Sequence, residues 1–227
     1  MEKTLKVVCI GDSITEGFGI AEDPLGPYPA QLQKLLGKEC QVFNQGVSCT
    51  CTVNRIKDGK CVGMPYVQEE KWKTALEIAG DIYVVMLGTN DAQDGYNEEE
   101  NREDPQNNVF AFREYFEEDY MKIVHEIHEK VPDTVIFSVK PVPVMESIWR
   151  QHQQSFLEKI LKKIDEIWEK NPWLMPVDMQ EIFMKYPWEE RKKLYQKDGL
   201  HPNKLGAELI AETVGKSIIQ WSQNVKR

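Results

Sequence analysis

The sequence predicts an α/β fold in which a parallel sheet carries helices on both faces. Short apolar segments that are typical of strands alternate with longer segments whose apolar residues recur at spacings of three and four. The strand segments are apolar almost throughout, as expected for strands buried on both faces of a parallel sheet. No internal repeat or Pro/Gly-rich linker interrupts the 227 residues, so we expect one domain over residues 1–227.

The first half of the chain contains three expected strands and two expected helices. The strands are short, mostly apolar runs, and the first helix has leucines at helical spacing and ends before Gly37. The expected strands are Leu5–Ile10, Cys40–Phe43 and Asp81–Leu87, and the expected helices are Tyr28–Leu36 and a stretch near Glu69–Ala79.

The second half adds two strands and three long amphipathic helices. Asp133–Val139 and Leu174–Asp178 read as strands, and Pro176 places the latter at an edge of the sheet because proline cannot donate to a ladder. Each helix is indicated by one apolar stripe that we expect to pack on the sheet. The stripes are Phe116, Tyr120, Ile123 and Ile127; Phe156, Ile160, Ile164, Ile167 and Trp168; and Ala207, Ile210, Val214, Ile218 and Trp221.

Composition and charge exclude several classes of protein. Hydrophobic residues make up 41% and charged residues 29% of the chain, an ordinary globular composition that excludes disorder, collagen and coiled coil as descriptions of the whole. The 28 basic and 37 acidic residues give a net charge of −9, and no long basic cluster is present. An acidic surface repels phosphate groups, so we expect no nucleic-acid or anionic-membrane partner.

The sequence also indicates where the protein works. No apolar run approaches the ~18 residues that span a bilayer, and no apolar signal segment follows Met1. The five cysteines are odd in number and form no C-x-x-C pair. We therefore expect a reducing, cytoplasmic setting and no membrane insertion, with export as the alternative. The sequence does not indicate an oligomeric state.

Unusual polar clusters follow the expected strands. In open α/β sheets, ligands bind at the carboxyl ends of the strands. Gly11–Gly17 follows the first strand, Asn44–Ser48 the second and Gly88–Asp91 the third, while Asp198–Pro202 precedes the last helix. The sequence therefore predicts a site at this edge of the sheet.

The most informative cluster is Asp198-Gly199-Leu200-His201. Asp198 can accept a hydrogen bond from Nδ1 of His201, which fixes the tautomer and leaves Nε2 free as a base, the logic of a catalytic triad. The alternative is a loop histidine with an incidental acidic neighbour. Ser13 could supply the nucleophile from a tight turn at a helix start, or it could be an ordinary helix N-cap.

A serine nucleophile needs hydrogen-bond donors for the oxyanion of its intermediate. Three candidates follow neighbouring strands: the backbone N–H of Ser13, the backbone N–H of Gly46 and the side-chain amide of Asn90. Each has a simpler reading, Gly46 as a turn residue and Asn90 as an Asx turn. Together with Ser13 and His201, however, they favour acyl transfer.

No cofactor or metal is expected. The chain has neither G-x-G-x-x-G nor G-x-x-x-x-G-K-[ST], so a nucleotide cradle is not indicated. His125 and His128 lack the i, i+4 spacing of the H-E-x-x-H motif. Cys49, Cys51 and Cys61 lack the tight pairs or histidine partners of a zinc site, and loop or core thiols are the simpler interpretation.

The four clusters together resemble the SGNH hydrolases, also called GDSL lipases or esterases. The family has four conserved sequence blocks, and the chain matches them in family order over nearly its whole length. The matching segments are Gly11-Asp12-Ser13, Asn44-Gln45-Gly46-Val47-Ser48, Gly88-Thr89-Asn90-Asp91 and Asp198-Gly199-Leu200-His201. The resemblance implies a flavodoxin-like three-layer α/β/α sandwich with a five-stranded parallel sheet of order 2-1-3-4-5.

The resemblance also implies a role for each site residue. Ser13 would be the nucleophile, His201 the base and Asp198 the orienting acid, with an oxyanion hole formed by Ser13, Gly46 and Asn90. Cys49 departs from the family pattern, because many members have glycine after the serine of the second block. That departure leaves the shape of this loop open and does not affect the triad.

Within the family, the chain resembles bacterial carbohydrate esterases, such as those similar to sialate O-acetylesterases or acetylxylan esterases. The similarity rests on the segment YPAQLQKLLG, on Pro65-Tyr66 and on the run VVMLGTNDAQ. It implies a serine esterase that removes acetyl or other short acyl groups from a small-molecule or oligosaccharide ester. The alternatives are a lysophospholipase or thioesterase of the same family, an acyltransferase, and a carbohydrate-binding protein that retains the fold without catalysis.

Residues that would contact the substrate are less clearly indicated. The loop Asp91–Asp104 is acidic and polar, unlike the apolar lid of a long-chain lipase, and it favours a short acyl group on a polar alcohol. It could equally be a solvated surface loop. Tyr66, Tyr96 and Trp149 could stack on a sugar ring, and Asp12 and Asp91 lie beside the expected catalytic groups. Ordinary packing is the alternative for each aromatic side chain.

Overall fold

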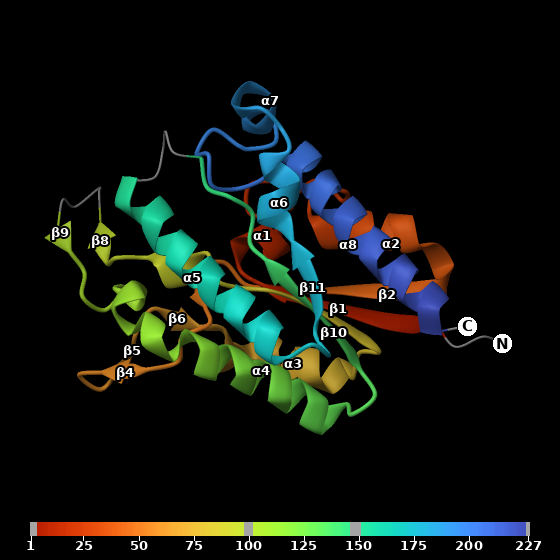
Figure 1. The fold of residues 1–227 in the computed structure, drawn as a ribbon, viewed down its shortest axis with the longest axis horizontal. Coiled ribbons are helices and arrows are strands. Elements are labelled where there is room, and N and C mark those ends of the chain that lie inside the picture. The colour runs from red at the N-terminus through yellow and green to blue at the C-terminus, as the bar shows by residue number, and fades with distance from the viewer. Residues whose placement is uncertain (1–3, 98–101, 146–150, 226–227) are drawn as a thin grey trace.

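A computed structural model of the chain describes residues 4–97, 102–145 and 151–225. Its centre is a five-stranded sheet in the order β11-β10-β7-β1-β2, and every neighbouring pair is parallel (Figure 1). Counted along the chain, these strands have the order 2-1-3-4-5, which confirms the expected topology. The strands are β1 (Leu5–Gly11), β2 (Cys40–Gly46), β7 (Ile82–Met86), β10 (Val135–Lys140) and β11 (Met175–Asp178).

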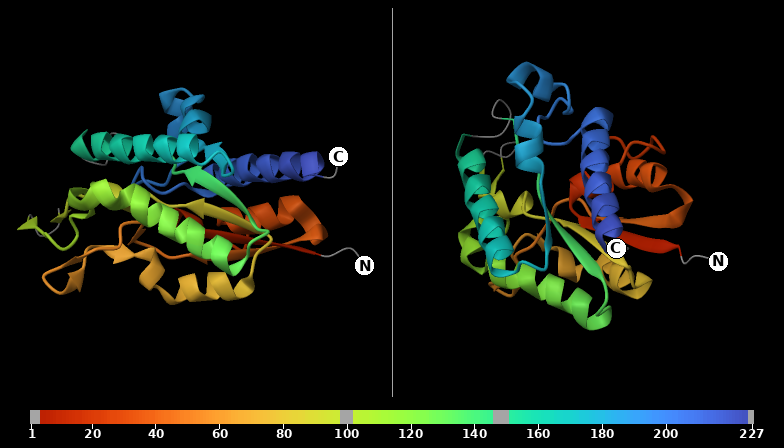
Figure 2. Two further views of the ribbon diagram at one scale, coloured as in Figure 1. Left: turned by 60° about the horizontal axis from the view of Figure 1, so that its bottom comes forward. Right: turned by 45° about the vertical axis from the view of Figure 1, so that its right-hand side comes forward.

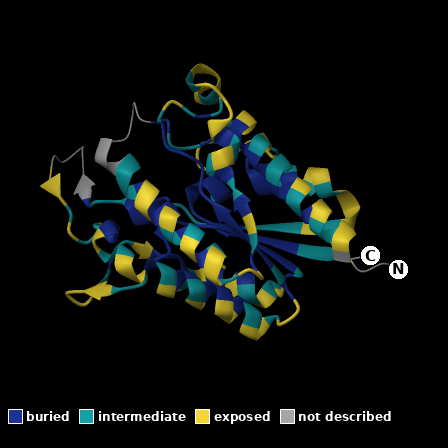
Figure 3. Ribbon diagram, viewed as in Figure 1, coloured by how far each residue is buried: buried dark blue, intermediate teal, exposed yellow. Residues whose placement is uncertain are grey.

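Helices cover both faces of the sheet, so the fold has three layers (Figure 2). One apolar core joins the sheet to α3, α4 and α5, and a second core on the other face joins it to α2, α6 and α8. The helices turn their apolar stripes inward and leave their outer faces exposed (Figure 3). Their bounds are α2 (Tyr28–Leu36), α3 (Glu70–Ile78), α4 (Phe116–Lys130), α5 (Gln151–Lys170), α6 (Met179–Met184) and α8 (Lys204–Val225).

The differences from the expected elements have local causes. β2 continues three residues beyond Phe43, because its polar end Asn44–Gly46 pairs with β1 in register and the apolar pattern does not record this. β11, which contains Pro176, is an edge strand as expected. Two short helices, α1 (Ser13–Glu16) and α7 (Trp188–Lys192), are too short to show a periodic pattern.

Short strand pairs lie outside the central sheet. β3 (Thr50–Cys51) pairs with β6 (Met64–Pro65), β4 (Ile56–Lys57) with β5 (Lys60–Cys61), and β8 (Tyr96–Asn97) with β9 (Arg102–Glu103). The last pair belongs to the acidic loop Asp91–Asp104, of which residues 98–101 lie outside the described part. None of the helices in the described ranges is long and apolar enough to span a bilayer.

Candidate active site

The site lies where three neighbouring strands of the sheet end together. Gly11 of β1 is paired with Gly46 of β2 on one side and with Met86 of β7 on the other. The segments that begin with Asp12, Val47 and Leu87 therefore leave the sheet side by side. Because the strands are parallel, the polar clusters predicted from the sequence meet at one edge.

Ser13, His201 and Asp198 form a continuous row of hydrogen bonds. The hydroxyl of Ser13 is 2.9 Å from Nε2 of His201, although the two residues are 188 positions apart in the sequence. Nδ1 of His201 is 2.8 Å from Oδ2 of Asp198. Asp198 therefore orients the imidazole and leaves Nε2 directed at Ser13, which is the geometry of a serine–histidine–acid triad.

Ser13 is not the N-cap of its helix. The cap is Asp12, whose Oδ1 accepts a hydrogen bond of 2.9 Å from the backbone N–H of Ile14. Ser13 is the first residue of α1, so its hydroxyl is free to face His201 and its N–H has no acceptor inside the helix. The simpler interpretation of Ser13 as a capping residue is therefore wrong.

Asp198 is held as a carboxylate by its neighbours. Its Oδ1 accepts the backbone N–H groups of Leu200 at 2.9 Å and His201 at 3.0 Å. Partial burial raises the pKa of Asp198, but the hydrogen bonds from the His201 side chain and from these two N–H groups outweigh it. The net pKa lies below its usual value, so the carboxylate persists at neutral pH.

The three candidate oxyanion donors lie at the expected strand ends, but two of them are engaged. The N–H of Gly46 donates to Oδ1 of Asn44 at 2.9 Å. The amide of Asn90 donates to the carbonyl oxygen of Thr50 at 2.9 Å, and it has a second hydrogen that this bond does not use. An oxyanion that binds Gly46 must therefore displace the side chain of Asn44.

Gly46 is glycine because another segment of backbone passes close to it. It is the last residue of β2 rather than a turn residue. A Cβ atom at this position would lie 2.2 Å from the backbone nitrogen of Glu16, in the helix that carries Ser13. The absence of a side chain thus lets the oxyanion candidate and the serine helix lie in direct contact.

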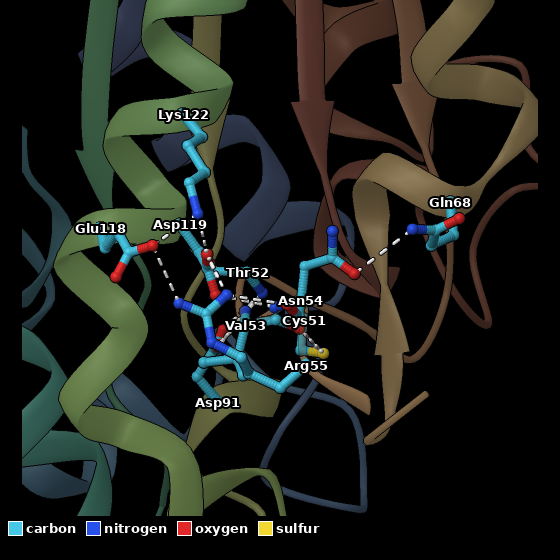
Figure 4. Close-up of polar contacts among 10 residues, drawn as sticks. All are labelled: Cys51, Thr52, Val53, Asn54, Arg55, Gln68, Asp91, Glu118, Asp119 and Lys122. Atoms are coloured by element: carbon cyan, nitrogen blue, oxygen red, sulfur yellow. Dashed lines mark hydrogen bonds and ion pairs between the residues drawn. The ribbon is translucent and has the colours of Figure 1, made fainter. Parts of the chain in front are cut away.

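Two buried carboxylates, those of Asp91 and Asp119, bind the segment Cys51–Arg55 (Figure 4). Oδ1 of Asp91 accepts the N–H groups of Thr52 at 3.0 Å and Val53 at 2.9 Å, and Oδ2 lies 2.9 Å from the same Thr52 nitrogen. These bonds fix the chain just beyond Thr50, whose carbonyl oxygen orients the amide of Asn90. Asp91 therefore positions the oxyanion candidate beside it and does not present its carboxylate to solvent.

Asp119 of α4 completes this anchor. Its Oδ2 accepts the N–H of Asn54 at 2.9 Å, and its Oδ1 lies 2.6 Å from Nη1 of Arg55 (Figure 4). Sequence reasoning missed Asp119, because it lies 64 positions from Arg55 in an acidic helix turn with no motif. The sequence offers one signal for it: Asp119 directly precedes Tyr120, a residue of the apolar stripe of α4, so an acidic side chain is expected close to the buried face.

Burial raises the pKa of both Asp12 and Asp91. Desolvation raises the pKa of Asp91 to about 6, against the lowering effect of the Thr52 and Val53 hydrogen bonds. Desolvation likewise raises the pKa of Asp12 to about 6, against the lowering effect of the Ile14 hydrogen bond and the nearby His201. Asp12 and Asp91 were candidate substrate contacts, but both residues are buried and neither presents its carboxyl group to solvent.

The raised pKa of Asp91 gives a testable pH dependence of stability. The folded state binds this proton more tightly than the unfolded state, so the contribution of Asp91 to the unfolding free energy rises as the pH falls from 7 to 5. A pKa of about 6 against an unfolded value of about 3.9 predicts a gain of about 1 kcal/mol over this interval. Urea unfolding at the two pH values should show this gain in the wild type relative to Asp91→Asn, which cannot titrate. An equal pH response in the two proteins would contradict it.

The aromatic residues expected to stack on a sugar are placed differently. Tyr66 is fully buried, its hydroxyl donates to the carbonyl oxygen of Gln45, and its ring packs against Trp72. It has no surface to offer a sugar, so the structure corrects that expectation. The backbone of Tyr96 lies in β8, but its side chain and the whole of Trp149 lie outside the described residues.

Cys49 adopts the conformation that glycine would favour. Its φ of 66° lies in the left-handed region, which glycine adopts more readily than other residues. Within the described part of the chain, the five cysteines are free, and no group of three or more histidine, cysteine or acidic side chains is arranged to hold a metal ion.

One further aromatic residue at the site was missed by sequence reasoning. The ring of Phe18 lies against the imidazole of His201, with 4.6 Å between the ring centroids, and half of the residue is exposed. Phe18 directly follows the glycine that ends α1, and nothing in the sequence distinguishes it from a phenylalanine buried in the core. Its position beside the histidine becomes visible only in the fold.

Comparison with known proteins agrees with this geometry. The model of the GDSL-like lipase/acylhydrolase family matches residues 9–209. An acetylxylan esterase from Xylanibacter ruminicola is 30% identical over 221 residues, which are 96% of this chain and 44% of that protein. The chain thus spans less than half the length of this relative.

Solved structures share the fold. A lipase/acylhydrolase from Enterococcus faecalis superposes with a TM-score of 0.67 at 21% identity, covering 94% of this chain and 95% of that chain. Axe2, an acetylxylan esterase from Geobacillus stearothermophilus, superposes with a TM-score of 0.65 at 18% identity, covering 96% of each chain. Because the family model covers the chain from β1 to α8, the protein belongs to the GDSL-like lipase/acylhydrolase family.

Proposed function

We propose that the protein is a serine esterase that removes acetyl or other short acyl groups from carbohydrate. The observation that carries the proposal is the row of hydrogen bonds from Ser13 through His201 to Asp198 at the carboxyl edge of the sheet. Membership of an acylhydrolase family places the chain among carboxylic ester hydrolases. We further propose that residues 1–227 act as one domain, because the helices of both faces pack on a single central sheet.

The proposed reaction has two steps. Nε2 of His201 takes the proton of the Ser13 hydroxyl as the oxygen attacks the acyl carbonyl, and the imidazolium then gives that proton to the leaving alcohol. This leaves the acyl group on Ser13. A water molecule then gives its proton to His201 and attacks the acyl group, after which Ser13 recovers its proton and the acid is released. The carboxylate of Asp198 stabilises the imidazolium in both steps.

The negative oxygen of each intermediate would bind the donors at the strand ends. The N–H of Ser13 and the second hydrogen of the Asn90 amide are available for it, and Gly46 becomes available when Asn44 moves away. Loss of one such donor costs on the order of 10²–10³ in rate in other acyl-transfer enzymes. The bonds of Asp91 and Asp119 to the segment Cys51–Arg55 support the Asn90 donor indirectly.

Two observations support a short acyl group on a carbohydrate alcohol. The relative that matches almost the whole chain is an acetylxylan esterase. The loop Asp91–Asp104 next to the site is acidic and polar, so it does not provide the apolar lid of a long-chain lipase. An oligosaccharide or small-molecule ester is therefore the proposed substrate.

The proposal predicts a dependence on acyl chain length. Hydrolysis of p-nitrophenyl esters from acetate to palmitate should fall steeply beyond acetate or butyrate, because the polar loop Asp91–Asp104 does not provide an apolar lid for a longer chain. Steady-state rates measured across the series test this directly. A maximum at long chains would move the function to lysophospholipids or thioesters. Transfer of acetyl to an added sugar in preference to water would show an acyltransferase.

A further inference from the structure

We infer that Phe18 is the platform that receives the sugar of the leaving alcohol and so determines specificity for it. This inference rests on the proposed function and names the side of the site on which the carbohydrate lies. Phe18 follows the four-residue helix α1 that begins with Ser13, and 52% of its surface is exposed. Other large apolar side chains are as exposed, but the ring of Phe18 contacts His201, so its open surface lies where a substrate of the reactive pair must bind.

The ring of Phe18 covers one face of His201. The two ring centroids are 4.6 Å apart, and the ring planes are inclined by 37°. The same imidazole donates and accepts through its edge, with Nε2 toward Ser13 and Nδ1 toward Asp198. Phe18 therefore touches the histidine without competing for either nitrogen, and the rest of its surface remains open.

The backbone of Phe18 is hydrogen-bonded to both chain segments that carry the triad. Its N–H donates to the carbonyl oxygen of Ser13 at 2.9 Å. Its own carbonyl oxygen accepts a hydrogen bond of 2.7 Å from Nε2 of Gln196, two residues before Asp198. The backbone under the ring is thus fixed to both halves of the site, and a fixed platform loses little entropy when a substrate binds.

The chemistry of the reaction places the leaving alcohol on the Phe18 side. The acyl oxygen must face the donors of Ser13, Gly46 and Asn90, whereas the alcohol oxygen must lie within reach of Nε2 of His201 to receive its proton. The group attached to that oxygen therefore lies beside the imidazole. Among the residues that the structure describes, Phe18 contacts that imidazole with an aromatic ring.

The exposed face of a phenyl ring can bind a sugar ring, although most of the surface of a sugar is polar. The C–H groups on one face of a pyranose form an apolar patch that packs on an aromatic ring, while its hydroxyls stay in water. Phe18 thus takes the role that the sequence had suggested for Tyr66, whose ring is buried.

The test compares a sugar ester with a small ester in the full chain. We would measure kcat and KM on acetylated xylobiose and on ethyl acetate for the wild type, Phe18→Ala, Phe18→Leu and Phe18→Tyr. Phe18→Ala should lose about five- to tenfold more in kcat/KM on acetylated xylobiose than on ethyl acetate, mainly through KM. Phe18→Tyr should restore this preference. Phe18→Leu should not, because leucine covers His201 but offers no aromatic face.

Trp173 provides a matched control. It is 43% exposed and lies edge-on to the ring of His128, but it precedes β11 at the opposite end of the sheet. Trp173→Ala should leave the ratio between the two substrates unchanged. Equal losses on both esters in Phe18→Ala, or full recovery in Phe18→Leu, would overturn the inference and leave Phe18 as a cover for His201. A wild type that hydrolyses ethyl acetate but not acetylated xylobiose would overturn the carbohydrate proposal itself, and the inference with it.

Discussion

Replacement of Ser13 by alanine is expected to lower kcat by on the order of 10⁴–10⁶, the largest effect of any single substitution in this chain. The reason is that Ser13 supplies the only oxygen that we propose to form the acyl-enzyme. Its hydroxyl is also the group that faces Nε2 of His201, at 2.9 Å. Hydrolysis of p-nitrophenyl acetate under saturating conditions measures the loss.

Two controls make this result specific. Ser13→Ala should unfold in urea close to the wild type, because Asp12 and not Ser13 caps α1. Ser48 offers a matched serine at the neighbouring strand end, and its hydroxyl is bound to the carboxylate of Glu16 rather than to a histidine. Ser48→Ala should keep most of the activity. Activity that survives in Ser13→Ala and disappears in Ser48→Ala would transfer the nucleophile to Ser48.

Replacement of Asp198 by asparagine is expected to lower kcat by on the order of 10³–10⁴. The asparagine oxygen can still accept the N–H groups of Leu200 and His201 that Oδ1 of Asp198 accepts now. Its NH₂ group would then face Nδ1 of His201 and hold the imidazole in the tautomer that carries its proton on Nε2. That tautomer cannot accept the proton of Ser13, so geometry is kept while the base is lost.

The control for this substitution is Asp23, which, like Asp198, accepts the backbone N–H of the residue two positions after it. Asp23 accepts the N–H of Leu25 at 2.9 Å and pairs with Lys204 on the surface. Asp23→Asn should change kcat less than about twofold, as expected for an exposed ion pair. If Asp198→Asn retained wild-type kcat, Asp198 would not orient the base and the triad would be wrong.

The sequence predicts the sheet well because its strands carry a strong signal. Buried strands of a parallel sheet are apolar throughout, and the amphipathic helices between them show one stripe each. These patterns locate the five strands, and Pro176 marks the edge strand. The order of the strands comes only from the resemblance to known hydrolases. The polar end of β2 is not visible in this way, because Asn44–Gly46 pairs with β1 through its backbone and contains no apolar side chain.

The site is predictable only where short motifs carry it. The pairing of Asp198 with His201 follows from a spacing of three residues, and the Ser13 contact from the family pattern. Other contacts at and around the site join residues that are far apart in the sequence, such as Asp119 with Arg55 and Phe18 with His201. No local pattern encodes such contacts. The hydrogen bond from the N–H of Gly46 to Asn44 is local. That Asn44 would compete with an oxyanion for this N–H becomes apparent only once the structure places Gly46 at the site.

The most direct test of the account is covalent labelling with a fluorophosphonate, followed by peptide mass spectrometry. The reagent reacts with a serine whose oxygen is activated by a neighbouring base. We predict one phosphonyl adduct, on the peptide that contains Ser13, with labelling strongly slowed in His201→Ala and absent in Ser13→Ala. No labelling of the wild type, or an adduct on a different serine, would contradict the assignment of Ser13 as nucleophile.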